Sequence, residues 1–350
     1  MKKKYLFISF IFLVFFNSSC SNFDKKTFST QVDSFLLESN FQGAVLISKG
    51  KKVLFSKGYG LCDYKDEKSP EITENTIFEV GSLTKQITAS AILQLENRKK
   101  LSTNDKLSKY FPDYKYGEQI TLEMLLNMRS GLTDCINNSE EFFPRNVHLQ
   151  IEKCQLQNKP IENDIILKYL NDAPLFAKPD STYFYCNTNY FLLAKIVEKV
   201  SGLSFSDYVQ KNIFKKCKMT HSNFEFQQTD TKGYDYNGKY YSIPESLSFG
   251  CGNLNSSTSD LFKWNKAFFG GKIISKKSLK KIINSSSYTS GFYKKQDMLF
   301  HGGTTNVFNS YNAYYLNSKL SIIVLTNQPI NKTNSTFVAG KLYKIYQNLY

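Results

Sequence analysis

Residues 78–89 read FEVGSLTKQITA, and they mark the passage from a short strand into a helix. Within them, Ser82 and Lys85 form an S-x-x-K pair. Residues three apart lie on the same face of a helix, so the Lys85 amine is expected within reach of the Ser82 hydroxyl. Apolar residues at a spacing of four support the helix: Leu83, Ile87, Ala91 and Leu95.

The S-x-x-K pair suits nucleophilic catalysis by the serine. A serine is a weak nucleophile until a base takes its proton. Lysine can be that base only where burial or neighbouring positive charge lowers its pKa, and a helix N-terminus adds N–H groups beside the hydroxyl. The motif alone is weak evidence, because the chain repeats it at residues 48–51 and 278–281, where surface positions are expected.

A second motif is Y-C-N at residues 185–187, directly before an apolar helical pattern. Tyr185 could accept or relay the serine proton, and the amide of Asn187 could donate to a substrate carbonyl. A packed aromatic side chain is the ordinary alternative for Tyr185.

A third motif is HGGT at residues 301–304, which precedes a strand predicted at residues 309–315. Two glycines, Gly302 and Gly303, would let a substrate backbone approach a strand edge closely. Glycines before a strand also commonly mark a turn.

Strands are predicted at both ends of the chain and helices in its middle. The order favours an α/β (α+β) fold, in which an antiparallel sheet flanked by helices is formed from both chain ends and carries an inserted all-helical subdomain. We expect one domain over residues 23–350, with its α/β part at 23–80 and 235–350 and its helical part at 81–234. Strands are expected at residues 43–48, 52–56, 77–81, 309–315 and 320–326, and helices at 27–40, 82–95, 121–128, 161–170, 188–200, 204–214, 258–269 and 333–350.

The three motifs in this order resemble those of the penicillin-interactive serine hydrolases, which include class C β-lactamases, D-alanyl-D-alanine carboxypeptidases and related esterases. Segments such as GAVLI at residues 43–47, SGL at 130–132 and IVLTN at 323–327 are also similar to this family. The resemblance covers most of the chain. It implies a β-lactamase/transpeptidase-like fold and an exported serine hydrolase that acts on amides, peptides or esters, such as D-alanyl peptides, β-lactams or small esters.

The resemblance also implies a role for each motif residue. Ser82 would be the acylated nucleophile, Lys85 its proton partner, and Tyr185 the acid/base for the leaving group. Whether the lysine or the tyrosine is the acylation base stays open. The substrate-binding residues would be Asn187 at the substrate amide, His301 in place of the family's usual lysine with a binding and electrostatic role, Gly302, Gly303 and Thr304, whose backbone N–H would form an oxyanion hole with that of Ser82.

Two departures from the family pattern lie close to these motifs. Met128 stands where the family has a histidine before the SGL segment, and Asp180 replaces a turn glycine after Pro179. Neither changes the three motifs.

A second functional hypothesis stands beside the serine hydrolase. In it, the protein is a catalytically inactive, membrane-anchored binding relative of the same fold.

The distribution of charged residues and histidines indicates which classes of binding partner to expect. The formal net charge of +15 comes from 45 basic and 30 acidic residues, but only Arg98, Arg129 and Arg145 are arginines and the lysines are scattered. Arginine supplies most bidentate contacts to phosphates and bases, so nucleic acid is not an expected partner. The three histidines are far apart, and no metal or other cofactor is implied.

The first twenty residues resemble an export signal. Residues 2–4 are lysines, an apolar run follows to Phe16, and small polar residues lead to Cys20. The run is too short to span a bilayer. A lipid on Cys20 would anchor the protein to a membrane, so we expect a bacterial cell-envelope lipoprotein, or else a periplasmic or secreted protein.

Six further cysteines follow Cys20, and export would permit disulfides. We expect buried or free thiols for most of them. Cys135 and Cys154 are the pair to test first, because they bracket a polar loop.

Overall fold

The structure is a computed structural model that describes residues 24–137, 163–225, 228–235, 237–240, 245–305, 307–328 and 334–349. The predicted leader, Cys20 and Cys154 lie outside these ranges. Cys135 is a buried free thiol, as are Cys62, Cys186, Cys217 and Cys251.

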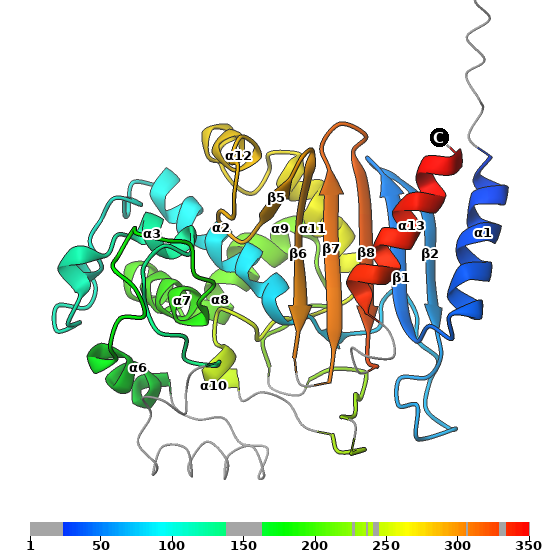
Figure 1. The fold of residues 1–350 in the computed structure, drawn as a ribbon, viewed down its shortest axis with the longest axis horizontal. Coiled ribbons are helices and arrows are strands. Elements are labelled where there is room, and N and C mark those ends of the chain that lie inside the picture. The colour runs from blue at the N-terminus through cyan, green and yellow to red at the C-terminus, as the bar shows by residue number, and fades with distance from the viewer. Residues whose placement is uncertain are drawn as a thin grey trace, which may run out of the picture.

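A six-stranded antiparallel sheet forms the centre of the fold, in the order β2-β1-β8-β7-β6-β5 (Figure 1). The two ends of the chain meet in it, because β1 pairs with β8 and Ala44 lies opposite Leu325. This confirms the expected antiparallel sheet built from both chain ends. The strands are β1 Gly43–Lys49, β2 Lys52–Tyr59, β5 Tyr293–Lys295, β6 Met298–Thr304, β7 Asn309–Tyr315 and β8 Leu320–Thr326, and a separate pair joins β3 Phe78–Glu79 to β4 Asn255–Ser256.

Both faces of the sheet are covered, which explains why β8 is buried along its whole length. Helices α1 Lys25–Glu38 and α13 Ser335–Leu349 pack side by side on one face (Figure 1). Phe28 of α1 and Tyr346 of α13 meet there edge to face. The other face receives α2 Thr84–Asn97 and α11 Thr258–Phe269, where the larger core lies.

The helical part lies beyond the β5–β6 edge, at the left of Figure 1. Helix α7 Asn187–Ser201 packs against α2 and brings the second motif to the first. The helix predicted over 204–214 is α8 Phe205–Val209 followed by a π-helical turn, Gln210–Phe214. The described residues also form helices α3 Leu122–Leu126, α6 Asn163–Asp172, α9 Lys215–Cys217, α10 Glu245–Ser248 and α12 Lys276–Ile283, with 3-10 turns at Gly81–Leu83, Leu107–Lys109 and Gly117–Gln119.

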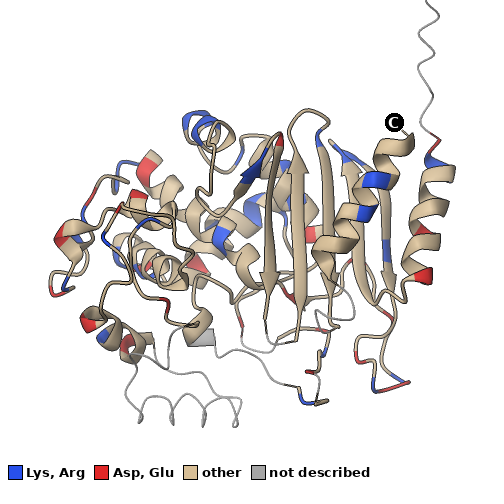
Figure 2. Ribbon diagram, in the orientation of Figure 1, with Lys and Arg blue, Asp and Glu red and all other residues tan. Residues whose placement is uncertain are grey.

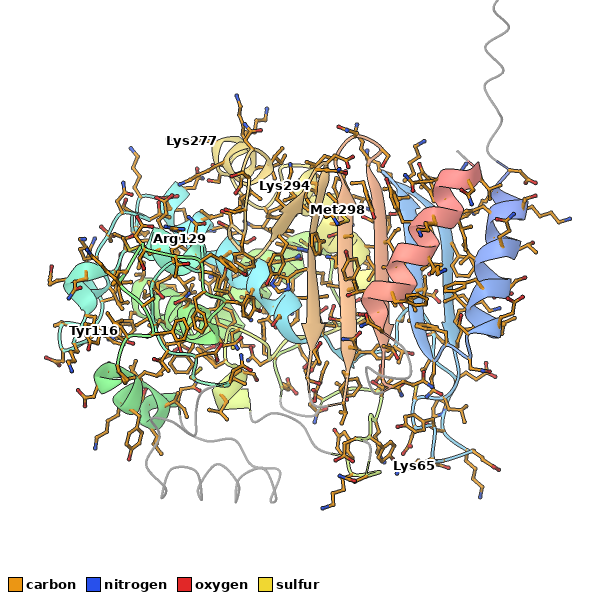
Figure 3. The ribbon with its side chains drawn as sticks, in the orientation of Figure 1. Lys65, Tyr116, Arg129, Lys277, Lys294 and Met298 are labelled. Atoms are coloured by element: carbon orange, nitrogen blue, oxygen red, sulfur yellow. The ribbon has the colours of Figure 1, made fainter. Side chains whose placement is uncertain are left out.

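One expectation about local structure was wrong, and one hairpin was not predicted. Ser82 does not open α2 but lies in the 3-10 turn before it, and α2 begins at Thr84. Residues 301–304 do not form a turn but lie inside β6, whose hairpin with β5 was not predicted; Figure 3 labels Lys294 and Met298 on it. The glycines of this strand weakened its sequence signal.

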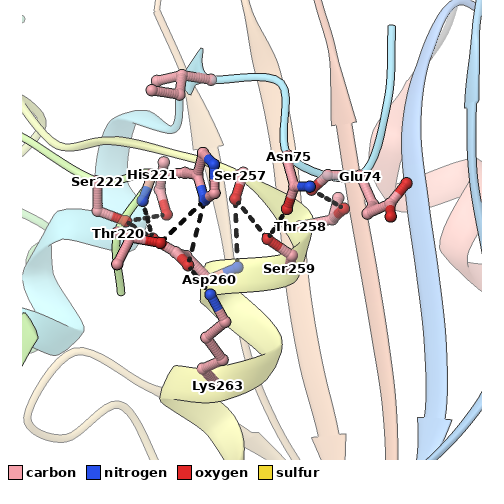
Figure 4. Close-up of polar contacts among 12 residues, drawn as sticks. Glu74, Asn75, Thr220, His221, Ser222, Ser257, Thr258, Ser259, Asp260 and Lys263 are labelled. Carbon is pink, nitrogen blue, oxygen red and sulfur yellow. Dashed lines mark hydrogen bonds and ion pairs between the residues drawn. The ribbon is translucent and has the colours of Figure 1, made fainter. Parts of the chain in front are cut away.

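The start of α11 is fixed by a buried polar cluster (Figure 4). Ser257 caps the helix by accepting from the N–H of Asp260. The buried Asp260 carboxylate accepts from the His221 N–H and the Ser222 hydroxyl, and it pairs with Lys263. These contacts tie the segment after α9 to the sheet domain. The elements that they join carry none of the three motifs.

Basic residues are spread over many elements of the described chain rather than gathered in one stripe (Figure 2). No helix within the described ranges is both long and apolar enough to cross a membrane.

Candidate active site

Ser82 and Lys85 meet as the spacing predicts. The 3-10 turn and the first turn of α2 place the Lys85 ammonium so that it donates to Ser82 Oγ at 2.9 Å. The same nitrogen donates to Asn187 Oδ1 at 2.9 Å and to the backbone oxygen of Cys251 at 2.7 Å. Three acceptors therefore hold the amine against the serine.

Lys85 has no exposed surface. Burial lowers the pKa of its amine, and the Cys251 thiol and the Asp134 carboxylate act in the opposite direction. A lowered pKa increases the fraction of neutral lysine at a given pH, which a lysine base requires.

Tyr185 approaches Ser82 from the other side. Its hydroxyl donates to Ser82 Oγ at 2.9 Å, and its ring centroid lies 4.9 Å from Lys85 Nζ. Burial raises the pKa of Tyr185 well above its ordinary value. The phenol is therefore protonated in the resting site and able to give a proton.

Gly81 and Gly303 bring the Ser82 turn close to β6. A Cβ on Gly303 would lie 2.1 Å from the Val80 oxygen and 3.0 Å from the Ser82 nitrogen, and one on Gly81 would lie 3.0 Å from the Thr304 nitrogen. Only glycine permits this approach on both sides. Ser82 and Thr304 line the same cavity, so their backbone N–H groups are candidates for the predicted oxyanion hole.

Gly303→Ala is expected to lower kcat about 100- to 1000-fold, because β6 must move away from the Ser82 turn and carry the Thr304 N–H, a candidate oxyanion donor, with it. Steady-state kinetics with a chromogenic ester measures the effect. Gly302→Ala is the matched control: its Cβ would meet nothing nearer than 3.7 Å, so its cost should be far smaller. Equal effects of the two substitutions would contradict this role of Gly303.

His301 forms part of an aromatic wall on β6 and β5. Its Nδ1–H donates to the Gly302 oxygen at 2.5 Å, so the bare Nε2 accepts from the Tyr288 hydroxyl at 3.4 Å. Tyr293 lies beside both rings and receives a hydrogen bond from Tyr183 at 3.1 Å. Burial, with the Lys85 charge adding to it, lowers the pKa of His301 to about 3. At neutral pH His301 therefore supplies shape and hydrogen bonding rather than positive charge.

Because His301 is buried in its neutral form, we expect the folded protein to lose stability in acid. Between pH 6.5 and about 3 the unfolded chain binds a proton at this histidine that the folded chain does not, so the free energy of unfolding decreases as pH falls. His301→Gln is expected to reduce the slope of unfolding free energy against pH by about 1.4 kcal/mol per pH unit. Urea unfolding of both proteins from pH 6 to pH 4 measures it, and identical slopes would contradict a buried neutral imidazole.

The segment that carries Tyr185 is held by the two family departures. Met128 adopts a positive φ of 57°, and its sulfur accepts from the Cys186 N–H and from Asn189 Nδ2, each at 3.3 Å. Asp180 also has a positive φ, 62°, which is the conformation that favours glycine, and it pairs with Arg129. Aspartate tolerates this conformation, whereas Met128 adopts it at an energetic cost while its sulfur anchors the segment.

The motifs face a cavity of about 490 Å³. All predicted motif residues line it except Lys85, which lies beneath the serine, and Gly303, whose contacts are with the Ser82 turn. Its lining residues are Gly81, Ser82, Ile136, Asn137, Tyr185, Asn187, Ser248, Cys251, Gly252, Tyr293, His301, Gly302, Thr304 and Thr305. In the described part of the chain no cluster of three or more His, Cys, Asp and Glu is placed to hold a metal ion.

Three features of this site were not predicted from the sequence: the Cys251 carbonyl, Tyr293 and Asp134. The Asp134 carboxylate accepts from the Asn187 side chain at 3.0 Å. Its position shortly after the family-like SGL segment was the one available signal.

The fold and the Ser82–Lys85–Tyr185 cluster define a penicillin-interactive serine hydrolase. A family model described as Beta-lactamase matches residues 31–339, and the chain belongs to that family. It is 29% identical over 328 residues to the putative penicillin-binding protein PbpX of Bacillus subtilis (strain 168), covering 90% of this chain and 78% of that relative.

Solved structures agree with the fold. The crystal structure of FmtA from Staphylococcus aureus superposes with a TM-score of 0.77 at 25% identity, covering 94% of this chain and 92% of FmtA. A class C beta-lactamase in complex with cefoxitin gives a TM-score of 0.73 at 20% identity, covering 93% and 99% of the two chains.

Proposed function

We propose that this protein cleaves amide or ester substrates through an acyl-enzyme on Ser82. Lys85 takes the Ser82 proton, and Oγ attacks the substrate carbonyl carbon. The resulting oxyanion lies between the backbone N–H groups of Ser82 and Thr304. As the tetrahedral intermediate collapses, Tyr185 gives a proton to the leaving group and takes one back from the Lys85 ammonium. Water then attacks the acyl-enzyme, its proton passes through the freed base to Ser82 Oγ, and the acid is released.

One observation carries this proposal: Ser82 Oγ lies 2.9 Å from both Lys85 Nζ and the Tyr185 hydroxyl. Burial shifts the two pKa values apart, lowering that of Lys85 and raising that of Tyr185. Titratable pairs separated in this way commonly divide the roles of base and acid. This supports Lys85 as the acylation base and Tyr185 as the acid for the leaving group.

The substrates we propose are D-alanyl peptides, β-lactams or small esters. The wall of Tyr293 and neutral His301 suits an acyl group held by shape and hydrogen bonds. The name of PbpX, a putative penicillin-binding protein, supports trying penicillin as an acylating ligand.

A panel of nitrocefin, D-alanyl dipeptides and p-nitrophenyl esters tests the proposed function. We expect turnover of at least one member at a rate well above buffer. Absence of turnover for the whole panel, together with no covalent capture of a fluorophosphonate, would contradict it and favour the inactive binding relative.

We also propose export and attachment to the cell envelope through Cys20, on the basis of the lysines, apolar run and small residues that precede it. Cys20→Ala should move the protein from the membrane fraction to the soluble fraction and abolish labelling by a radioactive fatty acid. Unchanged fractionation and labelling would contradict a lipid at this residue.

A further inference from the structure

Asp134 is a buried carboxylate beneath the catalytic cluster, with 1% of its surface exposed. No lysine or arginine in the described chain pairs with it. Neutral donors surround it instead: Asn187 N and Nδ2, Ile136 N, and Asn137 N and Nδ2, at 2.8–3.2 Å. Such a group is costly to bury, so a structural or functional use is expected.

One use is to cap helix α7. The capping position, Cys186, offers no side-chain hydrogen bond, and Asp134 accepts from the Asn187 N–H at 3.0 Å in its place. A carboxylate there also suits the positive end of the helix dipole. This use alone would not require a contact with the Asn187 side chain.

The second use is specific to the site. We propose that Asp134 is a positioning residue, which orients the Asn187 amide and through it the Lys85 amine; this rests on the proposed function. Asn187 Nδ2 faces the Asp134 carboxylate, which only accepts, and Asn187 Oδ1 faces Lys85 Nζ at 2.9 Å. A flipped amide would place its oxygen against the carboxylate and its NH2 against the amine, and both contacts would be lost.

The orientation matters when Lys85 is neutral. A neutral amine has two N–H bonds and one lone pair. Asn187 Oδ1 and the Cys251 oxygen accept the two N–H bonds, which leaves the lone pair directed at the Ser82 hydroxyl. Without Asp134 the amide is free to turn, and the lone pair loses this direction.

Asp134 also affects the pKa of Lys85, because its negative charge favours the ammonium. Removing that charge should lower the pKa of Lys85 further. The acid limb of the pH–rate profile should then move to lower pH. The other titratable groups around Lys85 are unchanged by the substitution: the thiols of Cys135 and Cys251, the phenols of Tyr185, Tyr190 and Tyr293, and the imidazole of His301.

The test is Asp134→Asn, read as the rate of Ser82 capture by a fluorophosphonate from pH 5 to pH 10. This probe needs no knowledge of the natural substrate. We expect the plateau rate to fall at least tenfold and the acid limb to move to lower pH. A plateau equal to that of the wild type would overturn the positioning role, wherever the limb falls.

Two comparisons separate positioning from folding. Asp260→Asn removes another buried carboxylate that supports a helix start (Figure 4). Asp260 does not line the cavity, so the substitution should lower thermal stability while leaving the capture rate unchanged. In a double-mutant cycle, Asp134→Asn should cost little further once Asn187 is alanine, because it acts through that amide. Full additivity would contradict the proposal.

If Asp134→Asn does not fold, Asp134→Glu carries the test. It keeps the charge but displaces the acceptor, so the acid limb should stay in place while the plateau falls. A wild-type plateau in this variant would overturn the proposal. Capture of the wild-type protein, and its loss in Ser82→Ala, test the proposed function independently of the Asp134 variants.

Discussion

Ser82→Ala is expected to lower turnover of any accepted substrate by about 10⁴- to 10⁶-fold, which brings it close to the rate given by binding and the oxyanion hole alone. The reason is that the acyl-enzyme cannot form without Oγ, whereas Lys85 and Tyr185 keep their places through other contacts. Stopped assays with concentrated enzyme measure the residual rate.

Ser278→Ala is the control for this prediction. It changes the serine of a second S-x-x-K sequence, at residues 278–281 on α12, which lies away from the cluster of Ser82, Lys85 and Tyr185. Wild-type activity is expected. A Ser82→Ala protein that keeps more than about a tenth of the wild-type rate would contradict nucleophilic catalysis by Ser82.

The second large effect separates the roles of Lys85 and Tyr185. Lys85→Met should lower kcat about 10²- to 10⁴-fold for amides and activated esters alike, because the serine must lose its proton in both reactions. Tyr185→Phe should cost a similar factor for an amide, whose nitrogen must be protonated to leave. It should cost much less for a p-nitrophenyl ester, whose leaving group needs no proton.

Steady-state kinetics of both variants on a matched amide and p-nitrophenyl ester of one acid makes this comparison. Equal losses on the two substrates in Tyr185→Phe, with a small loss in Lys85→Met, would reverse the assignment and make the tyrosine the base. The pH dependence adds a check: wild-type kcat/KM should rise with pH through a Lys85 pKa that lies below the ordinary value of about 10.4.

Much of this site could be predicted from sequence because its members lie in short motifs. The three-residue step from Ser82 to Lys85 is a property of one helical turn, and the hairpin of β1 and β2 follows from two apolar runs around KGK at residues 49–51. The placement of Tyr185 beside Ser82 came only from the family resemblance, because residues 103 apart carry no local signal for contact.

The parts that were missed depend on tertiary packing. The Cys251 oxygen is a backbone group, so its identity as an acceptor of Lys85 is independent of residue type. Asp134 contacts Asn187 across 53 positions of sequence. β6 was missed because glycine lowers strand propensity, although Gly303 is present for its close approach to the Ser82 turn.

Covalent capture of Ser82 tests the central claim most directly. The wild-type protein is incubated with penicillin or a fluorophosphonate, its intact mass is measured, and the modified peptide is sequenced by tandem mass spectrometry. We expect one adduct per chain on Ser82 and none on Ser82→Ala. An adduct on another residue, an adduct that persists in Ser82→Ala, or a wild-type protein that gains none with either probe would contradict the account.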